Sequence, residues 1–179
     1  MAECKICNII NKKVEAKIIY EDSAVMAVLS DEPTIFGHIL IFPKKHHLTL
    51  EEIDDKIVTQ LFYVASYTAT AIFEGLGAEG TNIIICNGKD SSNRYPHLVV
   101  DVLPRKTNDG IDTKWEPKKI TPEDMDSVHG RIKDKADIIN LSEDEKKQTN
   151  SPQQKQLSSA DELVYEEDNY LVRHLNRIP

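Results

Sequence analysis

The stretch GHILIFPKKHH, residues 37–47, decides how the rest of the sequence is interpreted. Its first part is an apolar run between a glycine and Pro43, which predicts a buried strand over 37–42. Downstream of this strand, apolar residues recur at helical spacing, and a long helix is expected over 51–74. A buried strand followed by a long amphipathic helix indicates a domain that mixes α and β structure.

Four further strands are predicted from β-branched and apolar runs bounded by turn residues, and these runs cover 17–20, 24–30, 81–86 and 96–103. Thr121 followed by Pro122 marks the start of a second helix, expected over 121–139. This order of elements predicts an α+β fold. Its core is a mostly antiparallel five-stranded sheet with one long helix and a C-terminal helix.

The composition limits the classes of function. The chain has 179 residues, 40% of them hydrophobic, and a net charge of −8, which argues against general binding to nucleic acid or an anionic membrane. No apolar run approaches the roughly 20 residues of a membrane-spanning helix. The first residues lack the apolar run of a signal peptide, and three cysteines form a poor disulfide framework. We therefore expect a cytoplasmic protein.

The C-terminal part of the chain differs in composition from the rest. Residues 140–160 are polar and rich in Gln and Ser, which predicts a disordered linker after a domain of residues 1–139. Apolar residues return in 161–179. We expect this short segment to dock on the domain itself or on a protein partner.

Two cysteines near the N-terminus suggest a metal site. Cys4 and Cys7 have the two-residue spacing that lets both thiolates bind one tetrahedral zinc. A redox pair would follow a strand, and none precedes Cys4. A pair of free thiols remains the alternative. Histidines at strand ends, His46 and His97, are available as further ligands, although lone histidines are more often ordinary polar side chains.

The sequence as a whole resembles the histidine-triad (HIT) superfamily of nucleotide hydrolases and transferases. The matching segments, in order, are the cysteine pair, IIYEDSAVMAVLSDEP, GHILIFPKKHH, the long helix, NIIICNGKDSSN and PHLVVDVLPR. The resemblance extends to about residue 139 and implies a HIT-like fold, a homodimer, and a nucleotide or phosphorylated small molecule as ligand. It also implies a structural zinc held by Cys4, Cys7, His46 and His97, with His47 as the alternative third ligand.

The triad itself departs from the family pattern, in which three histidines alternate along a strand and the middle one is the nucleophile. Here the segment reads His97-Leu98-Val99-Val100-Asp101. Val99 has no lone pair to attack phosphorus, and the Asp101 carboxylate would repel a phosphate. The resemblance assigns eight residues to the pocket: Ser30 with Asp31 at the ribose-binding position, and His38, Asn87, Asn93, Arg94, Val99 and Asp101.

Three functional hypotheses follow. The first is a non-catalytic or regulatory binding protein that keeps the fold and the zinc. The second is an enzyme of altered chemistry in the same pocket, with His38 and Asp101 as acid–base candidates or Arg94 as an anion clamp. The third regards the pocket as vestigial and the segment 161–179 as the functional part. No catalytic residue is assigned beyond the candidates His38 and Asp101.

Overall fold

The computed structural model describes residues 4–136 and divides the chain into two units, residues 1–114 and 115–179. The first unit holds a five-stranded sheet, two α-helices and a 3₁₀ turn, whereas the second contains helix α3. In chain order the elements are α1 Lys5–Ile10, β1 Ile18–Glu21, β2 Val25–Leu29, β3 Ile39–Pro43, η1 Leu50–Glu52, α2 Asp55–Leu76, β4 Gly80–Ile85, β5 Val100–Arg105 and α3 Pro122–Lys133. In the described part of the chain, no helix is long and apolar enough to cross a membrane.

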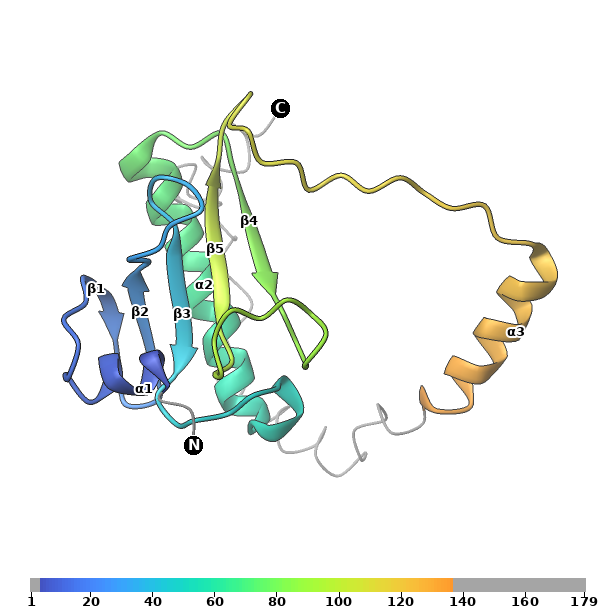
Figure 1. The fold of residues 1–179 in the computed structure, drawn as a ribbon, viewed down its shortest axis with the longest axis horizontal. Helices are drawn as coiled ribbons and strands as arrows, with labels where there is room; N and C mark the ends of the chain where they lie inside the picture. The colour runs from blue at the N-terminus through green and yellow to red at the C-terminus, as the bar shows by residue number, and fades with distance from the viewer. Residues whose placement is uncertain (1–3, 137–179) are drawn as a thin grey trace, which may run out of the picture. The chain divides into compact units, whose positions relative to one another are not determined.

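The sheet is antiparallel throughout, with the strand order β1-β2-β3-β5-β4 (Figure 1). The predicted α+β fold with five strands and one long helix is therefore confirmed. The central strand β3 pairs with β2 on one side and with β5 on the other, and Leu40 lies opposite Asp101. This register brings the beginning of β3 and the middle of β5 side by side.

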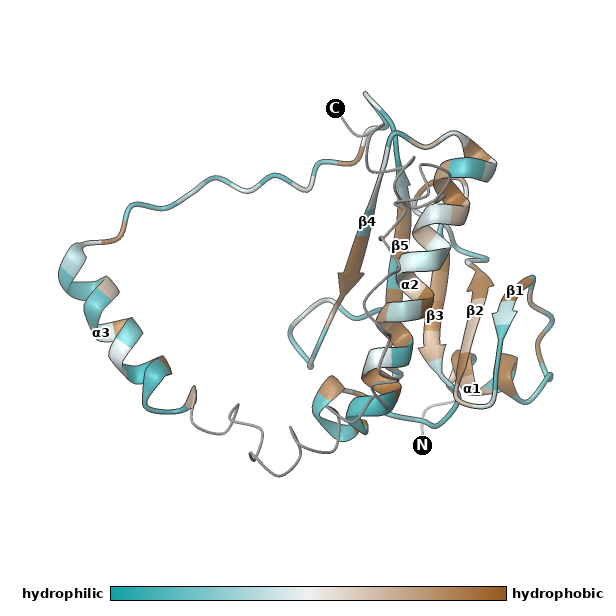
Figure 2. Cartoon of the chain, turned by 180° about the vertical axis from the view of Figure 1, so that it is seen from behind, coloured by the Kyte–Doolittle hydropathy of each residue, from teal (hydrophilic) through white to brown (hydrophobic). Residues whose placement is uncertain are grey.

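The central strands β2 and β3 are covered on both faces, because their side chains alternate between two apolar layers. On β3, Ile39 and Ile41 face α2, whereas Leu40 and Phe42 pack with residues of α1. Figure 2 shows α2 lying across one face of the sheet, with brown apolar residues along the strands beneath it. Strands β2 and β3 are continuous apolar runs for this reason.

Helix α2 begins at Asp55, after η1 at Leu50–Glu52, although a single helix over 51–74 was predicted. The chain is extended at Ile53 and Asp54, which separates the two elements. The helix ends at Gly77, whose φ of 59° suits glycine.

Helix α1 was not predicted from the sequence. The Cys4 side chain accepts the backbone N–H of Cys7 at 3.5 Å and so caps the helix. Ile6 and Ile9 are buried against the face of the sheet opposite α2. A six-residue helix is too short to be stable alone, so α1 depends on this packing and on its cap.

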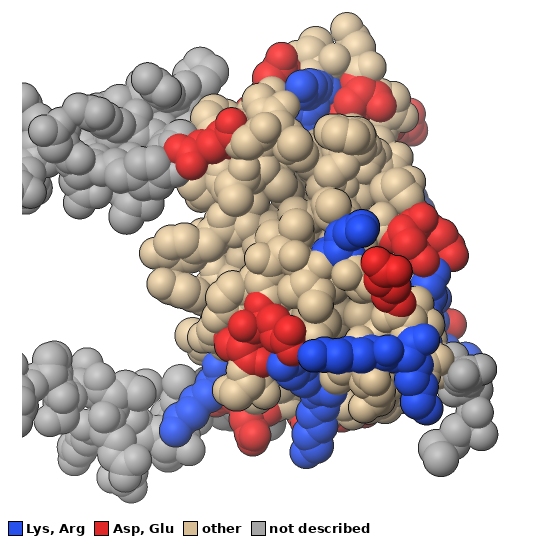
Figure 3. Space-filling view, turned by 90° about the vertical axis from the view of Figure 1, so that its left-hand side faces the viewer, with Lys and Arg blue, Asp and Glu red and all other residues tan. Residues whose placement is uncertain are grey.

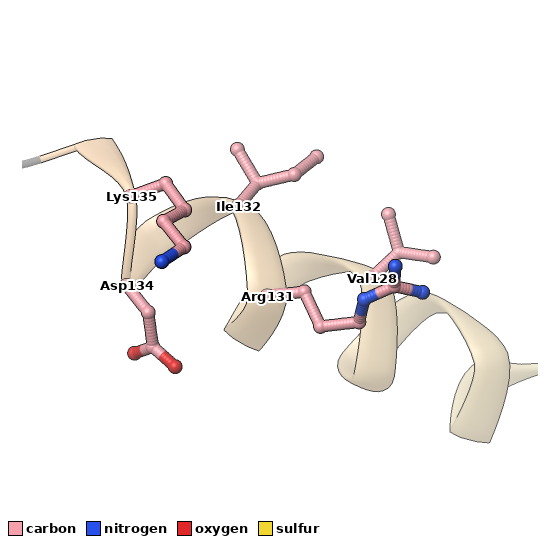
Figure 4. Close-up of a pocket in the computed structure, with 5 residues that line it drawn as sticks. All are labelled: Val128, Arg131, Ile132, Asp134 and Lys135. Atoms are coloured by element: carbon pink, nitrogen blue, oxygen red, sulfur yellow. The ribbon is translucent and has the colours of Figure 1, made fainter.

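The second unit is described only as far as residue 136. Thr121 caps α3 by accepting the backbone N–H of Asp124 at 3.1 Å. Figure 4 shows five residues that line a hollow at the end of this helix: Val128, Arg131, Ile132, Asp134 and Lys135. All five described lining residues belong to one stretch of chain, and they carry no functional assignment. The predicted linker 140–160 and docking segment 161–179 lie outside the described residues, and the domain boundary at 139 stays a prediction.

Candidate functional site

Four potential metal ligands from three separate segments meet at one end of the sheet. Cys4 and Cys7 come from the beginning of α1, His46 follows β3, and His97 precedes β5. The ligand atoms of these residues all lie within 4.8 Å of one another. Figure 1 shows the three segments converging at this end of the sheet.

The distances within the cluster fit a tetrahedral zinc ion. The Cys7 sulfur lies 3.2 Å from Nδ1 of His46 and 3.7 Å from Nδ1 of His97, and the Cys4 sulfur lies 3.6 Å from Nδ1 of His97. Zinc bonded to sulfur at about 2.3 Å and to nitrogen at about 2.0 Å would place these ligand atoms roughly 3.5 Å apart. Two thiolates and two imidazoles are also the donor set that structural zinc sites use.

His97 is held in the orientation that metal binding needs. Its Nε2–H donates to the Pro43 carbonyl at 2.9 Å, which leaves the Nδ1 lone pair directed at the cysteines. Burial, as the main cause, lowers the pKa of His97 to about 4. The ring is therefore neutral at pH 7. The neighbouring His47 is not part of the cluster, because its Nδ1 lies 3.8 Å from a carboxylate oxygen of Glu52.

A cavity of about 220 Å³ lies on the α1 face of the sheet. Side chains from β4, from β5 and from the loop between them surround it together with the segment before β3. The lining residues are Thr34, His38, Ile84, Cys86, Ser92, Asn93, Arg94, Tyr95, Asp101 and Leu103. The register explains this grouping, because Ile84 lies opposite Asp101 and both point to the same face.

His38 is 1% exposed, and both of its ring nitrogens are engaged. The backbone N–H of Thr34 donates to Nδ1 at 3.2 Å, so the ring proton resides on Nε2. Nε2–H donates to Oδ1 of Asp101 at 2.8 Å. The imidazole is therefore neutral, and neither nitrogen is free to exchange a proton with a ligand. In this arrangement His38 positions Asp101 and does not itself act as the acid or base.

Asp101 is the charged group at the floor of the cavity, and its side chain is 20% exposed. The Arg94 guanidinium lies 3.4 Å from the same Oδ1 that His38 contacts and stacks 5.7 Å from the centre of the Tyr95 ring. Arg94 also approaches the Glu32 carbonyl at 3.4 Å. The cavity thus contains one carboxylate and one partly exposed guanidinium that faces it.

Val99 directly precedes β5, and it is not among the residues that line the cavity. It is 3% exposed and packs in the apolar cluster that contains Ile6 and Ile9 of α1. Its predicted place in a ligand pocket stays a prediction.

Three other residues predicted to form the pocket are not among those that line the cavity. Ser30 has a buried hydroxyl without a hydrogen-bond partner in the described structure. Asp31 pairs with Lys5 at 2.8 Å, and this hydrogen bond lowers the pKa of Asp31. Asn87 accepts the Leu50 N–H at 2.9 Å and so holds η1.

Of the eight residues predicted to form the pocket, His38, Asn93, Arg94 and Asp101 line the cavity, and their role in ligand binding stays a prediction. The pocket residues predicted from the sequence do not include Thr34, Ile84, Cys86, Ser92, Tyr95 or Leu103. Because side chains alternate along β5, the position of Asp101 could have indicated that Leu103 faces the same cavity. The place of Ile84 in the cavity follows only from the register between β4 and β5.

A separate apolar groove runs between β1 and α2. Its lining residues are Ile19, Tyr20, Tyr63, Val64, Tyr67, Thr68 and Ala71. The rings of Tyr63 and Tyr67 lie 4.5 Å apart, and both are more than half exposed. Figure 3 shows the β1 side of the first unit, where acidic and basic side chains lie next to one another beside a broad uncharged area.

The described fold has a five-stranded antiparallel sheet, a long helix on one face and a Cys₂His₂ cluster at one end of the sheet. These features together define one class of α+β protein. The model of the HIT domain family matches residues 11–108, so the chain belongs to the HIT family. An uncharacterized HIT-like protein of Methanocaldococcus jannaschii is 34% identical over 131 residues, which cover 73% of this chain and 98% of that protein.

Solved structures agree with this assignment. A HIT family protein from Bacillus subtilis is similar with a TM-score of 0.68 and 27% identity, over 74% of this chain and 96% of that chain. A zinc-bound histidine triad family protein from Mycobacterium smegmatis has a TM-score of 0.59 and 32% identity, over 65% of this chain and 84% of that chain.

Proposed function

We propose that this chain is a zinc-stabilised HIT protein that binds a small ligand in the cavity without forming a nucleotidyl-histidine intermediate. The proposal rests on the residue type and the burial of Val99, which occupies the position of the family's nucleophile. A valine side chain cannot attack phosphorus, and this one is buried beneath α1.

The other histidines near the cavity do not replace the missing nucleophile. Both ring nitrogens of His38 are engaged, and its side chain is buried. His97 directs Nδ1 at the cysteines and Nε2–H at the Pro43 carbonyl. Among the described histidines that border the cavity, none has a free lone pair that faces it.

Zinc is the metal that the Cys4, Cys7, His46 and His97 cluster fits best. Support comes from the donor set, the sulfur–nitrogen distances and the hydrogen bond that orients His97. Four protein ligands leave no open position for a substrate, so the role proposed for the metal is structural. It would fasten α1 to the end of β3 and to the segment before β5.

An enzyme of altered chemistry is the second candidate, and the arrangement of Asp101 favours it. The carboxylate is partly exposed in the cavity and is oriented by His38, as a general base would be. In this alternative Asp101 is the base and Arg94 binds an anionic group of the substrate.

Turnover of a fluorogenic adenosine phosphoramidate by the full-length, zinc-loaded chain tests the proposal. We expect no detectable hydrolysis and no nucleotidyl adduct in the intact mass spectrum. An adduct on any histidine would refute the proposal. Turnover without an adduct would instead establish the second candidate, provided that Asp101→Asn abolishes this turnover and Asp126→Asn retains it. Asp126 is an exposed carboxylate of α3 and serves as the matched control.

We also propose a homodimer. Strand β4 is at the edge of the described sheet, and its Ile83 is exposed. The aromatic side chains of Phe62, Tyr63 and Tyr67 on α2 are exposed as well. An open strand edge and an apolar helix surface are features that a second copy of the chain would cover.

A further inference from the structure

Lys5 lies between the two cysteines of the metal cluster, and its side chain reaches the segment that leads into β3. Its Nζ lies 2.8 Å from a carboxylate oxygen of Asp31 and 2.9 Å from one of Glu32. The Lys5 side chain is 32% exposed, so both contacts are partly shielded from water. A side chain that leaves α1 between the two cysteines therefore fastens the segment before β3.

Glu32 connects this ion pair to the cavity. Its backbone carbonyl accepts a hydrogen bond from Nη1 of Arg94 at 3.4 Å, and Arg94 lines the cavity. Nη2 of the same guanidinium lies 3.4 Å from Oδ1 of Asp101 at the floor of the cavity. Glu32 thus contacts Lys5 with its side chain and Arg94 with its backbone. A continuous series of polar contacts runs from the metal cluster to the cavity.

Helix α1 is the element at the start of this series, and its stability depends on the metal cluster. Its six residues are too few for a helix that is stable by itself, and Ile6 and Ile9 pack it on the sheet. Metal bound by Cys4 and Cys7 would fix the backbone on both sides of Lys5. An empty cluster leaves α1 with its cap, its apolar contacts and the Lys5 ion pairs. Two states of α1, fastened and loosened, therefore correspond to an occupied and an empty cluster.

We infer that metal occupancy at the Cys₂His₂ cluster controls how open the cavity is, and that Lys5 transmits this control. With the cluster occupied, Lys5 holds the Glu32 segment in place, and the Glu32 carbonyl keeps Arg94 over Asp101. With the cluster empty, α1 loosens, both ion pairs weaken and the guanidinium is released from the cavity mouth. The inference rests on the proposed function, because it requires the cluster to hold zinc. Lys5 is a positioning residue here and does not itself line the cavity.

The thiol of Cys86 measures the opening directly. Cys86 lines the same cavity as Arg94 and is partly buried. Its thiolate displaces iodide from iodoacetamide, and the rate of this alkylation rises with the fraction of molecules whose cavity is open. An exposed ion pair shifts an equilibrium by a factor of about 1.4–5, so loss of both Lys5 ion pairs should raise the rate by about two- to twentyfold.

Peptide mass spectrometry of the full-length protein follows alkylation of Cys86 separately from the other two cysteines, with zinc bound and after its removal by a chelator. In the wild type, zinc removal should raise the Cys86 rate by about two- to twentyfold. Zinc-loaded Lys5→Met should already react faster by a similar factor, and zinc removal should then add little more. Lys5→Arg keeps the charge and should respond as the wild type does. Lys17→Met, which removes another lysine of the first unit, should do the same.

A second variant reaches the same ion pairs from the opposite side. Asp31→Asn combined with Glu32→Gln leaves Lys5 and α1 unchanged, so it should reproduce the fast alkylation of Lys5→Met even if that variant folds poorly. A wild-type Cys86 rate in this zinc-loaded double variant would overturn the inference. An equal response to zinc removal in Lys5→Met and in the wild type would overturn it too, because the coupling would then run through the apolar cluster under α1.

Zinc content, measured on the same samples, separates these results from failure of the proposed function. A wild-type chain that does not bind zinc would overturn the proposed metal site and the inference together. A zinc-loaded chain whose Cys86 rate is insensitive to Lys5 would overturn the inference alone and leave the structural metal in place.

Discussion

Replacing Cys7 with serine should release the metal and detach α1 from the sheet. The Cys7 sulfur is close to both histidine nitrogens of the cluster, at 3.2 and 3.7 Å, so its loss removes a ligand that contacts both partners. A serine hydroxyl stays protonated at neutral pH and does not replace a thiolate on zinc.

The magnitude follows from what holds α1 in place. Ile6 and Ile9 are buried, and such side chains contribute about 1.5–3 kcal/mol each, so together roughly 3–6 kcal/mol. Ordering the backbone of a helix of six residues costs about 1–2 kcal/mol per residue, which is roughly 6–12 kcal/mol in total. Apolar burial alone therefore does not offset this cost, and the cap, the Lys5 ion pairs and the proposed metal would contribute the rest. We expect Cys7→Ser to lower the free energy of unfolding by about 3 kcal/mol or more.

Three measurements on full-length protein check this reasoning: zinc content by mass spectrometry, urea unfolding, and hydrogen exchange of the α1 amides. Cys86→Ser is the matched control, because Cys86 lines the cavity and lies outside the metal cluster. Cys7→Ser should hold less than one zinc per chain and exchange its α1 amides rapidly, whereas Cys86→Ser should match the wild type. If Cys7→Ser keeps its zinc and its stability, the metal does not hold α1 in place.

Three further predictions concern the first unit. Gly37→Ala should lower the free energy of unfolding by about 1–3 kcal/mol in urea titrations, because φ is +85° and the Leu76 side chain occupies the place of the added Cβ; Gly80→Ala, with open space around it, should cost less. The hydrogen bond from Arg105 lowers the pKa of Asp109, so this pair stabilises the fold above pH 4, and the difference in urea midpoint between wild type and Asp109→Asn should vanish as the pH falls through the folded-state pKa. Tyr67→Asp should reduce the dimer fraction in light scattering at a fixed concentration, and an unchanged mass would exclude that surface as the interface.

The sheet and the long helix were predictable because their signals are local. Each strand is an apolar run between turn residues, and α2 repeats apolar residues at helical spacing. The start of α2 was misplaced by four residues, since the extended Ile53 and Asp54 separate η1 from the helix. Asp54 occupies the N-cap position without a side-chain capping hydrogen bond, and it lies among other acidic residues, so this boundary has a weak signal in the sequence.

The cavity was only partly predictable, because its composition depends on pairing between strands. Asp101 and His38 were predicted only as acid–base candidates, whereas the hydrogen bond between them follows from the pairing of β3 with β5. Asn87 has the residue type of a pocket side chain, yet its amide holds η1 in place. Such roles depend on which strands and loops meet in space, and the spacing of residues along the chain does not encode them.

Val99 lies between the metal cluster and the cavity in the sequence. From the segment before β5 into the strand, alternate residues are His97 at the metal cluster, Val99 in the apolar cluster and Asp101 at the cavity. A polar nucleophile at Val99 would be buried beside Ile6 and would require a hydrogen-bond partner there. With valine, the apolar layer under α1 is continuous as far as the cavity wall. Valine at this position therefore supports the helix that carries the two cysteines.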